Sequence, residues 1–191
     1  GKIYLSTNGG SSWTQVHTGG SRIELAVSSD ESTWVYALVS NSSSALYGIY
    51  KSTNSGSSFS QVYDGAPSGH NLLGWNSDGT GSSGQGWYDL SLAADPTDAN
   101  KVYVGGVNTW RTTDGGTSWN IVNHWWGDGV QAVHADKHNL TFNQSTGKLF
   151  EVNDGGIYST TNGTSWTHLT NGLVISQIYR LSVSQTDAET T

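Results

Sequence analysis

Short apolar stretches recur along the chain in a fixed order. Two of them begin each unit, as at 25–27 and 35–38, and further copies begin at Leu90, Leu140 and Leu181. A third stretch follows in each unit: Ile3-Tyr4, Ile49-Tyr50, Asn108-Thr109-Trp110 and Ile157-Tyr158. Because each stretch is short and is bounded by turn-forming residues, the pattern predicts β-strands joined by turns.

A motif of the form Ser/Thr-x-Asp/Asn-x-Gly-x-x-Trp/Phe, here called the box motif, follows each third stretch. Its polar and closing aromatic residues are Asn8, Trp13, Asn54, Phe59, Asp114, Trp119, Asn162 and Trp166, the last copy being one residue short. The Asp or Asn is expected to accept hydrogen bonds from amides of its own turn, and the aromatic ring to fold back onto the core of its sheet. Because four copies cannot all form one site, we assign the motif a structural role.

The closing aromatic residues are 46, 60 and 47 residues apart, about the length of one four-stranded propeller blade. The sequence therefore predicts an all-β fold, a β-propeller of antiparallel blades. Whole blades are predicted at 21–63, 86–122 and 138–170, with a partial blade at 1–17 and the start of another at 178–191. We expect residues 1–191 to belong to a larger propeller of about seven blades, so that the remaining blades are partners.

Two insertions break the period, a Gly/Ser-rich one at 64–86 and a second at 123–138. They occupy equivalent places in successive blades, so we expect them on one face, walling a pocket. Four tryptophans lie in or beside them: Trp75, Trp87, Trp125 and Trp126. Exposed indole rings stack on sugar rings, and with Asp128 nearby they indicate a carbohydrate site; packing of the rings against the insertions is the alternative.

Four residues share the position just before the inner-strand leucine, namely Glu24, Asp89, Asn139 and Arg180. Equivalent positions on inner strands converge towards the propeller axis, so we expect these side chains near the mouth of the central channel. They are candidate ligand-binding residues. Hydrated carboxylates without a ligand are the alternative.

His134, Asp136 and His138 alternate, so an extended backbone would place them on one side of a strand. Two imidazoles and a carboxylate can hold a divalent metal, with Asp128 or Asp154 as a further donor. The alternative is that His138 occupies a packing position between blades. No other cofactor is expected.

The composition narrows the possible partners and location. The formal charge is -7, with only 8 scattered Lys and Arg, which argues against a nucleic-acid partner. There is no apolar run long enough to span a membrane. The absence of Cys excludes disulfides and thiolate chemistry, and the Ser/Thr/Asn/Gly-rich surface favours an extracellular or bacterial cell-surface location.

The box motif resembles that of the Asp-box, or BNR-repeat, propellers, which include sortilin-like domains, sialidases and xyloglucan-active glycoside hydrolases. Segments 86–89, 104–108, 134–138 and 153–158 are most similar to propellers of large secreted Bacteroidetes proteins, which often carry a type IX secretion signal. A sialidase is disfavoured, because that family uses an arginine triad. The resemblance to xyloglucanases implies Asp154, in an Asp-Gly-Gly context, as a candidate catalytic residue, and Asp89 is a further candidate.

Three functions follow from these observations. The leading hypothesis is a non-catalytic extracellular module that binds glycan or protein on the face formed by 64–89 and 123–139. The first alternative is part of a glycoside hydrolase that uses Asp154 or Asp89 with a carboxylate from another segment. The second is a structural repeat of a large surface adhesin.

Overall fold

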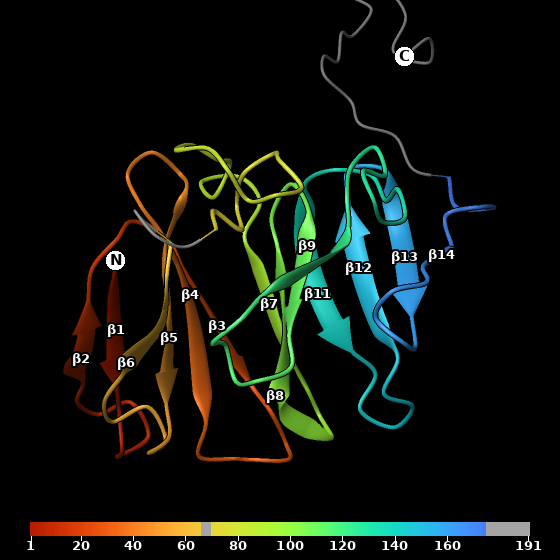
Figure 1. Ribbon diagram of the computed structural model, residues 1–191. Helices are drawn as coiled ribbons and strands as arrows, with labels where there is room; N and C mark the ends of the chain where they lie inside the picture. Colours follow the sequence, from red (N-terminus) through yellow and green to blue (C-terminus); the bar gives the residue numbers. More distant parts are fainter. Residues whose placement is uncertain (66–69, 175–191) are drawn as a thin grey trace, which may run out of the picture.

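The computed structural model describes residues 1–65 and 70–174, and the strands in these ranges form four separate antiparallel sheets that stand side by side (Figure 1). The first sheet pairs β1 (Lys2–Leu5) with β2 (Thr14–Thr18). The second contains β3 (Ile23–Val27), β4 (Val35–Ser40), β5 (Leu46–Ser52) and β6 (Ser60–Asp64). In each sheet, every strand pairs with the next strand along the chain.

The third and fourth sheets repeat this order. The third contains β7 (Ser91–Asp95), β8 (Asp98–Gly105), β9 (Thr109–Thr112) and β10 (Asn120–Asn123). The fourth contains β11 (Lys137–Phe142), β12 (Leu149–Asn153), β13 (Gly156–Thr160) and β14 (Thr167–His168). The first strands of the three four-stranded sheets are neighbours, since β3 contacts β7 and β7 contacts β11. This is the arrangement of propeller blades, and the predicted all-β propeller fold is confirmed. The further blade expected at 178–191 lies outside the described residues.

The hydrophobic core lies between the blades rather than within them. One cluster joins Leu38 and Ile49 of the second sheet to Leu92, Val104 and other residues of the third sheet. A second cluster joins Ala93 and other residues of the third sheet to the fourth. Side chains alternate across a strand, so alternate residues of β7 face the second sheet and the fourth sheet. Each blade is stabilised by the blades beside it.

All four box motifs form the same local hydrogen bonds. In the third, the Thr112 hydroxyl donates to Asp114 at 2.7 Å and accepts the amide of Gly116 at 3.1 Å. The Asp114 carboxylate also accepts the amide and the hydroxyl of Ser118, and these bonds lower its pKa to about 2. Gly116 has a φ of 101°, which side-chain-bearing residues rarely adopt. The motif therefore closes the turn from within.

The closing aromatic residues also reach the blade before their own. Trp119 lies in the core cluster that contains Tyr36 and Ile49, and its ring meets Tyr63 with centroids 6.4 Å apart, all in the preceding blade. Trp166 lies in the second cluster, which joins the third sheet to the fourth. Trp119 and Trp166 are each 5% exposed, whereas Trp13, in the first described sheet, is 62% exposed. The aromatic residue of the motif thus joins two neighbouring blades. It is buried in the two motifs named here that have a four-stranded blade before them.

This difference allows a matched test at one motif position. We expect Trp119→Ala to lower the free energy of unfolding by about 3–5 kcal/mol, because it opens a cavity between two blades. Trp13→Ala should change it by less than about 0.5 kcal/mol, as for a surface substitution. Urea denaturation followed by circular dichroism measures both. Equal effects of the two substitutions would contradict the interblade role.

Candidate functional site

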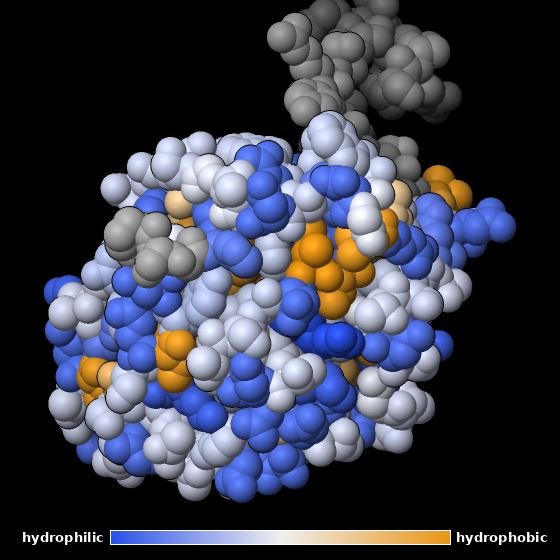
Figure 2. Space-filling view, in the orientation of Figure 1, coloured by the Kyte–Doolittle hydropathy of each residue, from blue (hydrophilic) through white to orange (hydrophobic). Residues whose placement is uncertain are grey.

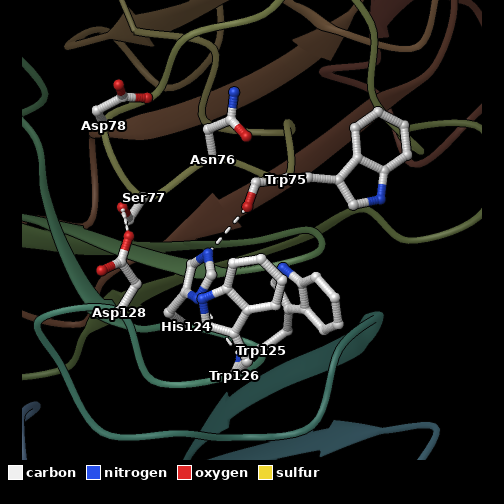
Figure 3. Close-up of a pocket in the computed structure, with 8 residues that line it drawn as sticks. All are labelled: Trp75, Asn76, Ser77, Asp78, His124, Trp125, Trp126 and Asp128. Carbon is white, nitrogen blue, oxygen red and sulfur yellow. Dashed lines mark hydrogen bonds between the residues drawn. The ribbon is translucent and has the colours of Figure 1, made fainter.

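The two insertions meet and enclose a pocket of about 210 Å³. One wall comes from the insertion between β6 and β7, and the other from the segment that follows β10. Its lining residues are aromatic or polar: Trp75, Asn76, Ser77, Asp78, His124, Trp125, Trp126 and Asp128 (Figure 3). The structure therefore brings together three of the predicted ligand-binding residues, Trp125, Trp126 and Asp128, with the tryptophan of the first insertion.

Asn108 fixes the two walls relative to each other. Its side chain is fully buried, and its amide nitrogen donates to the carbonyls of Gly74 and Trp75 at 3.1 Å each. Its amide oxygen accepts the backbone amide of Trp125 at 3.1 Å. One side chain thus satisfies backbone groups of both insertions, and leaving such groups unpaired in the interior would be costly. The sequence reasoning identified the insertions but not this residue that joins them.

His124 is a second link, and its partners define its protonation. Its Nε2 lies 2.9 Å from the carbonyl of Trp75, which can only accept, so Nε2 carries a proton. Its Nδ1 faces the backbone amide of Trp126 at 3.4 Å, which can only donate. These two partners assign the buried ring as the Nε2–H tautomer.

The pocket combines exposed aromatic surface with carboxylates. Trp75, Trp125 and Trp126 are 41%, 39% and 65% exposed, and the rings of the last two lie with centroids 4.4 Å apart. Asp128 accepts the Ser77 hydroxyl, and Asp78 accepts the hydroxyl and the amide of Thr80, which lower its pKa. In the view of Figure 3, both carboxyl groups lie on one side and the indole ring of Trp75 on the other.

The remaining predicted ligand-binding residues do not line this pocket. Trp87 is 69% exposed and leans on Tyr88, with ring centroids 5.3 Å apart. Glu24 is half-buried on β3, where burial raises its pKa, and Asn139 is exposed on β11. Arg180 lies outside the described residues. Trp87, Glu24 and Asn139 are therefore not part of the pocket lining.

Asp89 was expected to be an accessible ligand-binding residue, but its side chain is fully buried. Neither of its carboxyl oxygens accepts a hydrogen bond from a described donor, and it faces Asp136, which accepts the Gln85 side-chain amide at 2.8 Å. Burial, followed by the charge of Asp136, raises the pKa of Asp89 to about 8. Asp89 is therefore largely protonated at neutral pH, and in that form it can donate a hydrogen bond to Asp136.

The expected metal triad is not formed. Asp136 has a φ of 66°, so the backbone is not extended there and His134, Asp136 and His138 point to different partners. His138 Nε2 lies 2.7 Å from Asp154, which also accepts the Tyr88 hydroxyl at 3.0 Å. The described residues contain no group of three or more His, Asp or Glu arranged to hold a metal. His138 instead packs edge-on against Tyr88 of the preceding blade.

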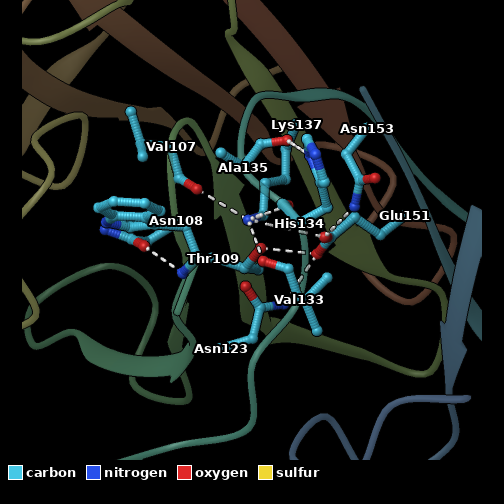
Figure 4. A network of polar contacts seen from close by, with 12 residues as sticks. Val107, Asn108, Thr109, Asn123, Val133, His134, Ala135, Lys137, Glu151 and Asn153 are labelled. Carbon is cyan, nitrogen blue, oxygen red and sulfur yellow. Dashed lines mark hydrogen bonds and ion pairs between the residues drawn. The ribbon is translucent and has the colours of Figure 1, made fainter. Parts of the chain in front are cut away.

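Lys137, between these residues, is a buried cation that sequence reasoning missed. Its ammonium donates to the carbonyls of Val107 and His134 at 2.8 Å each and lies 3.9 Å from Glu151 (Figure 4). Glu151 is also fully buried. Its Oε2 accepts hydrogen bonds from Thr109 at 2.6 Å and from the Asn123 side-chain amide at 3.0 Å, and its Oε1 accepts one from the Asn153 side-chain amide at 3.2 Å. Burial lowers the pKa of Lys137, while Glu151 opposes that change. The network fastens the segment after β10 to the third and fourth sheets.

The face of the molecule seen in Figure 2 is mostly hydrophilic, with apolar residues in small separate patches. Within the described residues, no helix is long and apolar enough to cross a membrane.

No protein-family model and no curated protein matches the chain. Solved structures are similar in fold. An ancestral GH74 enzyme matches with a TM-score of 0.57 and 20% identity, over 87% of this chain and 21% of its own. The GH74 enzyme of Niastella koreensis matches with a TM-score of 0.55 and 20% identity, over 87% of this chain and 25% of its own. The chain thus spans a quarter or less of these proteins, and at this identity the likeness shows the propeller fold alone.

The buried acid predicts a pH dependence of stability. Folding raises the pKa of Asp89, so the protonated side chain contributes to the free energy of unfolding. This contribution is fully present below the pKa of the unfolded chain, near 4, and is lost as the pH rises towards about 8. Relative to Asp89→Asn, the native protein should lose up to about 1.4 kcal/mol of stability per pH unit in that window. Denaturation of both proteins across the pH range measures the difference. A constant difference would show that Asp89 titrates normally.

The Lys137 network predicts a second effect on stability. Lys137→Met should lower the free energy of unfolding by about 3–5 kcal/mol, because it leaves Glu151 buried without its cation. Lys2→Met, at an exposed lysine, serves as the control and should have little effect. Thermal denaturation at neutral pH compares them, and a neutral outcome for Lys137→Met would contradict the assigned role of the network.

Proposed function

We propose that this propeller segment is a non-catalytic, extracellular module that binds glycan in the pocket between its two insertions. The observation that carries the proposal is the grouping of Trp75, Trp125 and Trp126, all partly exposed, around a pocket with polar walls. Sugar rings have apolar CH faces and a rim of hydroxyl groups. Indole surfaces suit the first, and fixed hydrogen-bonding groups suit the second.

The rigidity of the pocket supports this role. Asn108 and His124 hold the backbone of both walls through buried hydrogen bonds. The rings of Trp125 and Trp126 pack against each other, and this contact restricts the movement of the exposed Trp126 ring. A site that is ordered before binding loses less conformational entropy when the ligand arrives.

The size of the pocket favours glycan over protein as the ligand. A stable protein interface buries roughly 800 Å² on each partner. The three tryptophans instead surround a concavity of about 210 Å³, which suits one or a few sugar rings. The Ser/Thr/Asn/Gly-rich, Lys-poor composition supports an extracellular setting for such a module.

A hydrolase is less well supported by the candidate catalytic residues. Asp89 is fully buried, so a substrate has no access to its carboxyl group. Asp154 is already engaged by His138 and Tyr88. The structural likeness to GH74 enzymes concerns the propeller fold, and it carries no activity over to this chain.

The proposal is tested on a glycan array with the whole chain. Trp126→Ala should weaken binding about tenfold, because it removes the most exposed ring of the pocket. Trp13→Ala is the matched control, since Trp13 is similarly exposed, at 62%, but lies outside the pocket. Unchanged binding by Trp126→Ala would exclude the pocket as the site. A native chain that binds no glycan would favour the structural-repeat hypothesis.

A further inference from the structure

The charges around the pocket are all of one sign. Asp78 and Asp128 contribute two carboxylates, and no Lys or Arg is among the residues that line it. The hydrogen bonds from Thr80 to Asp78 favour its ionised form. The remaining titratable group of the lining, His124, is neutral because one ring nitrogen donates and the other accepts.

This arrangement discriminates between classes of glycan. Ionised carboxylates accept hydrogen bonds and cannot donate them. Sugars bearing carboxylate or sulfate groups would meet like charge in the pocket, and the net charge of the chain, -7, adds to that repulsion. A protonated amine would instead find two opposite charges and partly exposed indole surface, which attracts cations.

We propose that the pocket selects glycans built from amino sugars whose amino groups are free and protonated. This inference rests on the glycan-binding function proposed above and names its ligand class. The CH face of the sugar lies on Trp126, and the ammonium group is directed to the side of the pocket that carries Asp78 and Asp128 (Figure 3). Ser77, which donates to Asp128, keeps that carboxylate in place.

Three oligosaccharides of different charge test the inference. Isothermal titration calorimetry with hexamers of glucosamine, N-acetylglucosamine and galacturonic acid compares a cationic, a neutral and an anionic chain, at a pH where glucosamine is protonated. We expect the glucosamine hexamer to bind about fivefold more tightly than the N-acetylglucosamine hexamer, and the galacturonic acid hexamer most weakly. Raising the salt concentration should reduce the difference, because exposed charges are screened.

Variants assign the preference to the two carboxylates. Asp128→Asn and Asp78→Asn should each reduce the ratio of glucosamine-hexamer affinity to N-acetylglucosamine-hexamer affinity, and the double variant should bring that ratio to about one. Glu31→Gln is the control, because it removes one charge from an exposed residue outside the pocket lining. The Glu31→Gln variant should prefer the glucosamine hexamer to the same degree as the native chain.

The outcomes distinguish this inference from the proposed function. Equal binding of the cationic and neutral hexamers, together with loss of both in Trp126→Ala, would overturn the amino-sugar preference and leave glycan binding standing. Failure of all three hexamers and of the glycan array would overturn both. Binding that is lost when EDTA is added would place a divalent cation between the carboxylates and would also overturn the inference.

Discussion

The fold depends on apolar contact between neighbouring blades. The two core clusters each span a pair of sheets, so no described blade has a core of its own. The box motifs extend this contact, since Trp119 and Trp166 each cover the blade before their own. The motif therefore closes a hairpin with polar groups and joins two blades with an aromatic ring. Stability and relative blade position come from the same contacts.

The position of the pocket follows from this constraint. Its two walls belong to insertions that lead into consecutive blades, and packing between the second and third sheets fixes where they begin. Asn108, on the turn before β9, then ties the wall that contains Trp75 to the wall that contains Trp125. A pocket between loops is thereby held by a side chain anchored to a sheet. This explains how Gly/Ser-rich segments can present an ordered set of aromatic rings.

The repeat allowed the strands, the blade order and the meeting of the two insertions to be predicted, because each depends on spacing along the chain. It could not predict which neighbour a side chain faces. Asp89 occupies the position expected near a channel, yet it points to Asp136 of the next blade and is buried. Alternation of His134, Asp136 and His138 was a reasonable basis for a shared face, but the positive φ of Asp136 breaks it. Such local backbone changes, and long-range links such as Asn108, leave no periodic signal.

Buried polar contacts help to determine the path of the segment between β10 and β11. At its start, the backbone of His124 pairs with those of Gln131 and Val133, and at its end the Lys137 ammonium binds carbonyl groups on the same segment and on the turn before β9. Apolar contacts tolerate small displacements, whereas a buried donor or acceptor that loses its partner is strongly unfavourable. These contacts therefore favour one conformation of the segment over its alternatives. Because Trp125 and Trp126 lie within it, the same buried groups determine the direction in which the pocket presents its aromatic surface.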